Sequence, residues 1–234
     1  MAPRSTRPVL SLQGVTLSER QLSTTHTHLN LELRRGEVAL IEVGDENDAT
    51  ALVDLCMGLV DPRVGHVRFL GADWRSRNPR ERLGRRRRIG AVMQTRVWPT
   101  HLSVLDSVLL SRFYHFDRPR EEVIADATAL ARLFGLPGLP AGRQETTPFR
   151  ALVRAACVRG FLGAPDLIVV QDQAVDETGE LGVPMAQAIA AAQDRGAAVL
   201  WITETLAATA ARFVQADRVY RLADQGLIPV RRPR

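Results

Sequence analysis

The sequence predicts an α/β fold in which a mixed sheet with helices carries an all-helical subdomain. Strand-like patterns dominate the first third of the chain and return after residue 165, whereas residues from about 104 to 162 lack strand signals and show helical spacing of apolar side chains. In the outer parts strands alternate with helices, which is typical of a parallel sheet covered by helices. We therefore expect a single domain over 1–234, with a sheet core at 1–93 and 165–230, a helical subdomain at about 94–164 and a tail at 231–234.

The expected elements follow from apolar periodicity, which alternates in strands and recurs every three or four residues in helices. Strands are expected at 9–15, 29–33, 37–43, 66–70, 89–93, 167–170, 198–202 and 218–222. Helices are expected at 49–59, 78–88, 104–113, 120–134, 149–162, 181–195 and 206–213. A polar loop, residues 45–48, is expected to join the third strand to the first helix.

Composition excludes several kinds of chemistry. All 31 basic residues are arginine, so no lysine is present to form a Schiff base, act as a general base or reach the phosphates of a nucleotide. Cys56 and Cys157 lie in apolar helical runs, which predicts buried, reduced thiols. His26 and His28 have no third ligand nearby in sequence, so no metal site is expected. No stretch approaches the roughly 18 apolar residues of a membrane span, so we expect a cytosolic protein or one held at a membrane by a partner.

The order of these segments resembles the nucleotide-binding subunit of an ABC transporter, from Val9 through Ile228. The landmarks are a strand–loop–helix unit near Gly44, a glutamine after a strand at Gln94, and a strand that ends in 201–204. Segments 89–108 and 154–170 carry most of the similarity, and the spacing looks closest to the Mla/Mce-type lipid-transport ATPases. The resemblance implies a P-loop NTPase-like ABC ATPase fold.

The segment at the position of the phosphate loop departs from that family. The family pattern has several glycines and then a lysine and a hydroxyl residue, so that backbone N–H groups and the amine surround the phosphates. Here Ala49 stands where the lysine belongs, and Thr50 keeps the hydroxyl. The rest of the segment consists of Gly44 and a polar run that contains Asp45, Glu46 and Asp48. These carboxylates would repel a triphosphate, although they would also suit the positive end of a helix dipole.

The other positions that the family uses for chemistry have changed too. After the apolar strand, Gln171 replaces the aspartate on the magnesium side, and Asp172 takes the place of the glutamate that polarises water. Asp172 suits a helix N-cap or a turn equally well. Glu204 stands at the histidine that contacts the γ-phosphate, and Gln94 alone is retained. The signature segment is replaced by Thr147, Pro148, Phe149, Arg150 and Ala151.

The expected function is therefore that of a catalytically degenerate ABC subunit, which supports a membrane permease as a structural or regulatory pseudo-ATPase. The resemblance implies transmembrane permease subunits as partners, a homodimer or a heterodimer with another ABC subunit, a peripheral place on the cytoplasmic face of the inner membrane, and lipid transport as one possibility. No catalytic residue and no cofactor are expected. If weak ATP hydrolysis persists instead, Thr50, Gln94 and Asp172 would serve it with ATP and Mg²⁺. A third interpretation is an arginine-rich nucleic-acid-binding module, suggested by the run 75–88, although no partner nucleic acid is expected.

Two surfaces are expected to bind partners. A permease would dock on a surface with exposed aromatic rings, unless these rings pack the core of the helical subdomain; its candidates are Gln94, Trp98, Phe113, Tyr114 and Phe116. In a head-to-tail dimer, Arg150, with Arg143 and Arg154 nearby, would face the acidic segment of the other subunit and bind its carboxylates in place of phosphates. Solvated surface charges explain the same residues.

Overall fold

The computed structural model describes residues 7–17, 28–76, 78–93, 98–115, 118–171, 179–205 and 213–230. In chain order its elements are β1 (Leu10–Thr16), β2 (Leu29–Leu33), β3 (Val38–Glu42), α1 (Glu46–Cys56), β4 (Val64–Phe69), β5 (Ala72–Asp73), α2 (Pro79–Arg86), β6 (Ile89–Val92), α3 (Val104–His115), α4 (Arg120–Leu133), the 3₁₀ turn η2 (Gln144–Thr146), α5 (Phe149–Phe161), β7 (Leu167–Gln171), α6 (Gly182–Asp194), β8 (Ala198–Thr203), β9 (Arg218–Ala223) and β10 (Gly226–Pro229). The predicted mixed α/β fold with a helical subdomain is confirmed.

A six-stranded sheet forms the centre of the molecule, in the order β10-β9-β3-β8-β7-β6. The strands from β9 to β6 are parallel, and β10 pairs antiparallel with β9. Successive side chains alternate between two apolar cores, so that Leu40 and Trp201 face the core shared with the helical subdomain, while Ile41 and Leu200 face the core around α1. Burial on both faces explains why these strands read as nearly continuous apolar runs.

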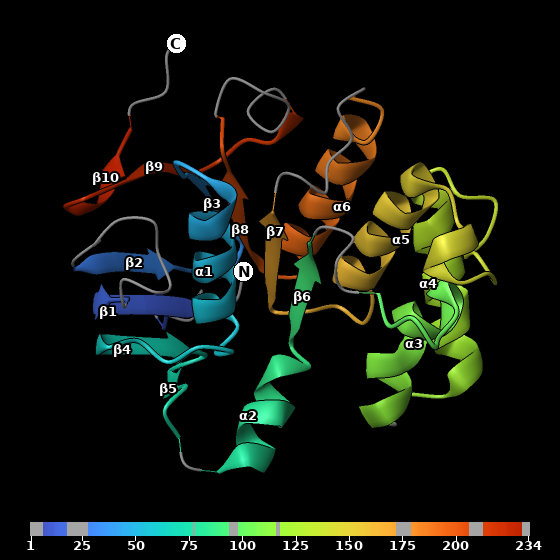
Figure 1. Ribbon diagram of the computed structural model, residues 1–234, viewed down its shortest axis with the longest axis horizontal. Helices are drawn as coiled ribbons and strands as arrows, with labels where there is room; N and C mark the ends of the chain where they lie inside the picture. Colours follow the sequence, from blue (N-terminus) through green and yellow to red (C-terminus); the bar gives the residue numbers. More distant parts are fainter. Residues whose placement is uncertain are drawn as a thin grey trace.

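A second, four-stranded antiparallel sheet has the order β2-β1-β4-β5. The α1 helix lies between this sheet and the central one, and the helices α3, α4 and α5 gather at the opposite end of the molecule (Figure 1). The sequence patterns predicted the strands of the second sheet but not its separation from the parallel sheet. The two added strands, β5 and β10, are too short or too polar to show alternation.

The helical subdomain meets the central sheet through a close contact between α5 and β6. A Cβ atom at Gly90 would stand 1.7 Å from the carbonyl oxygen of Gly160, and one at Gly160 would stand 2.4 Å from a methyl group of Val92. Only glycine on both elements permits this approach.

Other boundaries depart little from the expected ones. α1 begins three residues earlier than predicted, so the expected loop 45–48 is largely helical. The helix expected at 206–213 lies almost wholly outside the described residues. Over the described ranges, no helix combines the length and apolar character needed to cross a membrane.

Candidate functional site

The candidate site lies where β3, β7 and β8 end, at the carboxyl edge of the parallel strands, which is the edge where open α/β sheets bind ligands. The junction between β3 and α1 is short, because only residues 43–45 separate the strand from the helix. The backbone N–H of Val43 donates to the carbonyl oxygen of Thr203 over 2.8 Å, which ties the junction to the end of β8. The site therefore starts from a compact turn, with few residues that could surround a ligand.

The α1 helix begins early because its own side chain caps it. Asp45 has an extended backbone, and its Oδ1 accepts a hydrogen bond from the N–H of Asp48 over 2.9 Å. Aspartate is among the best N-cap residues, and Glu46 and Asp48 add negative charge in the first turn, where the helix dipole favours it. The loop predicted at 45–48 is therefore wrong for residues 46–48, which form the first turn of the helix that Asp45 caps.

The carboxylate of Asp48 lies inside the junction. This side chain is only 4% exposed, and its Oδ2 is 3.9 Å from the position of a Cβ on Gly44. Negative groups of ligands bind at helix N-termini through free N–H groups and the dipole. At the N-terminus of α1, the carboxylates of Asp45 and Asp48 occupy the position where a negative group of a ligand would bind.

The two residues considered for the phosphate-loop lysine and hydroxyl lie within α1 and not in a loop. Ala49 is buried, and Thr50 is exposed on the following position of the helix. The spacing of the phosphate-loop pattern puts the lysine six residues after the first glycine, which is Thr50 when counted from Gly44. Neither residue carries an amine, so the lysine is missing by either count.

The neighbouring strand ends carry the remaining candidates. Gln171 is the last residue of β7, is buried and lies opposite Ile202 of β8. Glu204 follows β8 and is exposed. Asp172 and Gln94 lie outside the described residues. The structure thus brings Gly44 and the ends of β7 and β8 to one edge, but it describes neither the retained glutamine nor the proposed water-polarising position.

The residues that replace the signature segment form the entry to α5. Thr147 ends the 3₁₀ turn and donates through Oγ1 to the carbonyl of Arg143, and Pro148 occupies the N-cap. Phe149 is 63% exposed and Ala151 is half-buried.

The arginines at this entry have partners within the chain. Arg150 pairs with Glu180, and Arg154 reaches the same carboxylate over 2.7 Å and the carbonyl of Gly135 over 2.8 Å. The expected pairing of Arg150 with a partner's acidic segment would have to break this ion pair, and Asp45 and Asp48 are engaged inside the chain as well.

The expected exposure of the docking aromatics is wrong for Trp98, which is 5% exposed and packs in the core of the helical subdomain. The guanidinium of Arg159 lies 4.4 Å from the centre of its ring, and burial lowers the pKa of Arg159 to about 10. Phe113 is half-buried beneath Arg120, whereas Tyr114 is 64% exposed. Phe116 lies outside the described residues. Trp98 thus follows the alternative in which the ring packs the core of the helical subdomain, whereas Tyr114 keeps the expected exposure.

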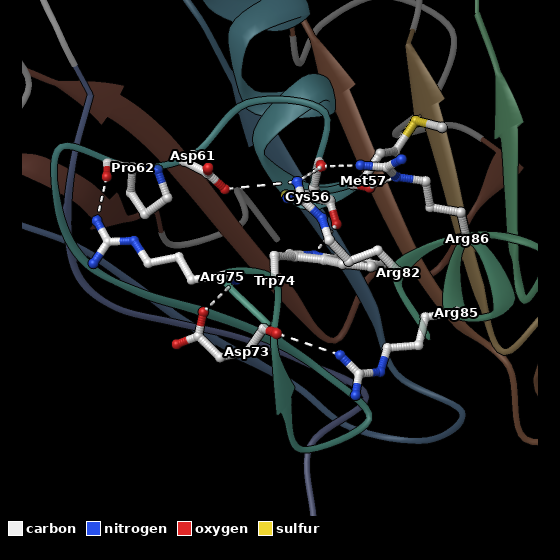
Figure 2. A network of polar contacts seen from close by, with 11 residues as sticks. Cys56, Met57, Asp61, Pro62, Asp73, Trp74, Arg75, Arg82, Arg85 and Arg86 are labelled. Carbon is white, nitrogen blue, oxygen red and sulfur yellow. Dashed lines mark hydrogen bonds and ion pairs between the residues drawn. The ribbon is translucent and has the colours of Figure 1, made fainter. Parts of the chain in front are cut away.

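Several arginines of the run 75–88 turn toward the protein rather than along an outer stripe. Arg82 donates to the carbonyl of Gly58 over 3.1 Å, Arg86 donates to the carbonyl of Met57 over 3.2 Å, and Arg88 pairs with Asp166 over 2.7 Å (Figure 2 shows the first two). The contacts of Arg82 and Arg86 close the C-terminus of α1, which has no basic residue in its own last turn. The sequence pattern did not predict this role, although the absence of a basic residue in the last turn of α1 could have indicated it.

Both cysteines are buried and unpaired, as predicted. Burial raises the pKa of each thiol to about 12. At neutral pH both remain protonated, so neither is a nucleophile of the kind that a reactive thiolate provides.

Comparison with solved structures shows the fold. The chain superposes on the dimeric bacterial ABC transporter cassette MJ0796 with a TM-score of 0.78 at 20% identity, over 93% of this chain and 96% of that one. An ATP-binding subunit of an ABC transporter matches with a TM-score of 0.76 at 17% identity, covering 94% and 88% of the two chains. CbiO1 of Clostridium perfringens, part of the CbiONQ transporter complex, matches at 0.69 and 16% identity over 95% and 87%. No protein-family model and no curated protein sequence matches the chain. It therefore has the fold of ABC ATPase cassettes.

Proposed function

We propose that this chain is an ABC-type subunit that supports a membrane permease without ATP hydrolysis of its own. The observation that carries the proposal is the β3–α1 junction, where Asp45 caps the helix and the buried carboxylate of Asp48 lies against Gly44. A triphosphate placed there would meet two carboxylates without a lysine to offset them. Each such pair at about 4 Å costs roughly 1 kcal/mol even in bulk water, and more near a protein surface.

The changes at the other positions point the same way. Gln171 offers a neutral amide where a hard cation needs a carboxylate, and Arg150 is engaged by Glu180 at the entry to α5. A composite site between two subunits would therefore lack both of its halves. No cofactor is expected, and we propose that Glu204 and Asp172 have no catalytic role.

The fold itself supports a role beneath a permease, since MJ0796 is described as a dimeric transporter cassette and CbiO1 as part of a transporter complex. We propose that this chain likewise forms a homodimer or a heterodimer, binds transmembrane subunits and lies peripherally on the cytoplasmic face of the inner membrane. Transport of lipids is the more specific proposal, and it depends on the sequence resemblance to the Mla/Mce-type ATPases. Tyr114 is the exposed aromatic residue left as a docking anchor within the described part of α3.

The test is a titration of the purified chain with a fluorescent ATP analogue and Mg²⁺, followed by unlabelled Mg-ATP and calorimetry. We expect no binding at millimolar nucleotide. A dissociation constant below about 100 μM, or roughly −5.5 kcal/mol, would show that the subunit keeps a nucleotide site. In the same titration, the variant Asp48→Ala tests the buried carboxylate, because it removes this group and keeps the Asp45 cap. Asn47→Ala, on the exposed face of the same turn, is the matched control.

The alternative of weak ATP hydrolysis makes a different prediction for the same preparation. Phosphate release that is abolished by Asp172→Asn and needs Mg²⁺ would favour it over the pseudo-ATPase. The nucleic-acid alternative requires an outward basic stripe. It is disfavoured because contacts within the chain hold Arg82, Arg86 and Arg88 toward the protein, so the run does not form one continuous outward stripe.

A further inference from the structure

A second site lies away from the β3–α1 junction, in an open hollow between α2 and the segment that follows α1. Its volume is about 530 Å³, and it is lined by Asp61, Arg75, Ser76, Pro79, Arg82 and Arg86. Figure 2 shows Arg82 and Arg86 extending from α2 toward the segment that follows α1, and Arg75 extending from the β5–α2 connection toward Pro62. Three guanidinium groups and one carboxylate give the lining a formal charge of +2 at neutral pH.

The backbone holds these arginines in place while leaving part of each guanidinium available. Arg75 donates through Nη2 to the carbonyl of Pro62, and Arg82 donates through Nη2 to that of Gly58. Arg86 donates through Nε to Met57 and through Nη2 to Gly58. Among the residues that the structure describes, none accepts a hydrogen bond from Nη1 of these three arginines, or from the buried Nε of Arg82.

The charge in the hollow is poorly compensated. Asp61 is half exposed and stands 3.7 Å from Arg82, which is a loose ion pair. Burial and then the positive charge of Arg82 lower the pKa of Arg86, although Asp61 opposes this effect. Two guanidinium groups that repel each other at the same wall are stabilised when an anion binds between them.

We propose that this hollow binds a phosphate group. The planar fork of arginine matches phosphate oxygens with paired hydrogen bonds, and each of the three arginines has an Nη1 donor left for a ligand. A phosphate monoester carries about −1.5 to −2 charges at pH 7, which matches the +2 of the lining better than a single carboxylate does. This inference does not rest on the proposed function, because none of the lining residues belongs to the β3–α1 junction.

The phosphate could come from a soluble metabolite or from the headgroup of an anionic lipid. Leu59 and Leu83 adjoin the lining residues in sequence and are 51% and 43% exposed. Apolar side chains beside a basic site would suit the surface of a bilayer. The experiment has one arm for each source.

In the first arm, the full-length chain is titrated with inorganic phosphate and followed by the NMR signals of arginine Nε–Hε groups. In the second, the chain is floated with vesicles of phosphatidylcholine with or without phosphatidic acid. Saturable shifts with phosphate indicate a soluble ligand, and capture that requires phosphatidic acid without such shifts indicates a lipid headgroup. Either result supports the site if the variants below respond as expected.

Three variants separate a defined site from general attraction to a basic surface. Arg75→Gln removes a lining guanidinium, and we expect binding to weaken about tenfold, or 1.4 kcal/mol. Arg80→Gln removes the same charge from an exposed position of α2 that does not line the hollow, and binding should stay within about twofold. Asp61→Asn removes the one carboxylate among the described lining residues, together with its loose ion pair to Arg82, so it should tighten binding.

Urea unfolding of each variant checks that the fold is intact. The proposal is wrong if neither arm shows saturable binding. It is also wrong if Arg75→Gln and Arg80→Gln weaken binding equally, because the attraction would then follow net charge alone.

Discussion

The two ends of α1 carry charges that compensate the helix dipole, but these charges come from different parts of the chain. At the N-terminus, negative charge comes from the helix's own sequence, through the Asp45 cap and Asp48 in the first turn. At the C-terminus, positive charge comes from Arg82 and Arg86 of α2, which lie 24 and 28 residues after the carbonyl of Gly58 that they share. Both arrangements have the sign that the helix dipole favours.

The N-terminal cap is formed by residues of the helix and its cap position, whereas the C-terminal cap is a tertiary contact with α2. The N-terminal cap needs no other element, so it can form as soon as the helix does, and it leaves little positive potential for a bound anion. The C-terminal cap exists only after α2 has packed against α1, and it leaves donors of the same arginines facing a hollow. The chain thus has its own carboxylates at the N-terminal end of α1, and it has gathered arginine side chains at the C-terminal end.

The largest effect is expected for Gly58→Ala at the C-terminal end. Gly58 has a φ angle of +66°, and a Cβ atom there would stand 2.3 Å from the ring of Trp74. Left-handed strain adds roughly 1–2 kcal/mol and overpacking roughly 1–3 kcal/mol, so the free energy of unfolding should fall by about 2–5 kcal/mol. Denaturant unfolding measures the change.

The matched control is Gly84→Ala in α2, where an added Cβ would have no atom within 4 Å. Alanine is the better helix former, so this variant should be neutral or more stable by about 0.5–1 kcal/mol. A loss of stability equal to that of Gly58→Ala would show that the contact with Trp74 is not the cause.

Removal of a tertiary cap should have the next largest effect. Arg86→Gln deletes the donors that reach the carbonyls of Met57 and Gly58. Because hydrogen bonds from charged groups contribute about 1.5–3 kcal/mol, we expect a loss in that range by urea unfolding. Arg80→Gln, on an exposed part of the same helix, should change stability by less than about 0.5 kcal/mol. Equal losses in both variants would contradict the cap.

The local cap at the other end should contribute less. Asp45→Ala removes the acceptor for the N–H of Asp48 and should lower the free energy of unfolding by about 1 kcal/mol. Asn47→Ala, which is exposed in the same turn, should stay within about 0.5 kcal/mol. If the two variants unfold alike, Asp45 does not function as the N-cap in solution.

The same distinction explains how much could be predicted from the sequence. Periodicity located the parallel strands of the central sheet, because burial on both faces leaves long apolar runs, and it found the helices of the subdomain. It did not indicate β10. The acidic segment was recognised as suited to a helix N-terminus, although the helix itself was started three residues late. Features that depend on one to five nearby residues could therefore be predicted from the sequence.

Features that depend on distant contacts were not. Nothing near Gly90 in sequence indicates that the carbonyl of Gly160 lies against it. Trp98 was predicted as an exposed anchor, but it is buried in the subdomain and Arg159 lies over its ring. The run 75–88 looked like a uniform basic stripe, whereas folding divides it between the α1 cap, ion pairs and the hollow.

The smallest expected effect is the coupling between the two ends of α1. The helix has 11 residues, which corresponds to about 16 Å, and the groups that Asp45 and Arg86 bind are at opposite ends. Changes more than about 7–10 Å apart with no shared partner usually add within about 0.5 kcal/mol. The double variant Asp45→Ala/Arg86→Gln should therefore lose the sum of the two single losses, as measured by urea unfolding at low and high salt. A coupling above about 1 kcal/mol that disappears at high salt would show instead that the two caps act on one dipole across the whole helix, and that the ends of α1 cannot be treated as independent sites.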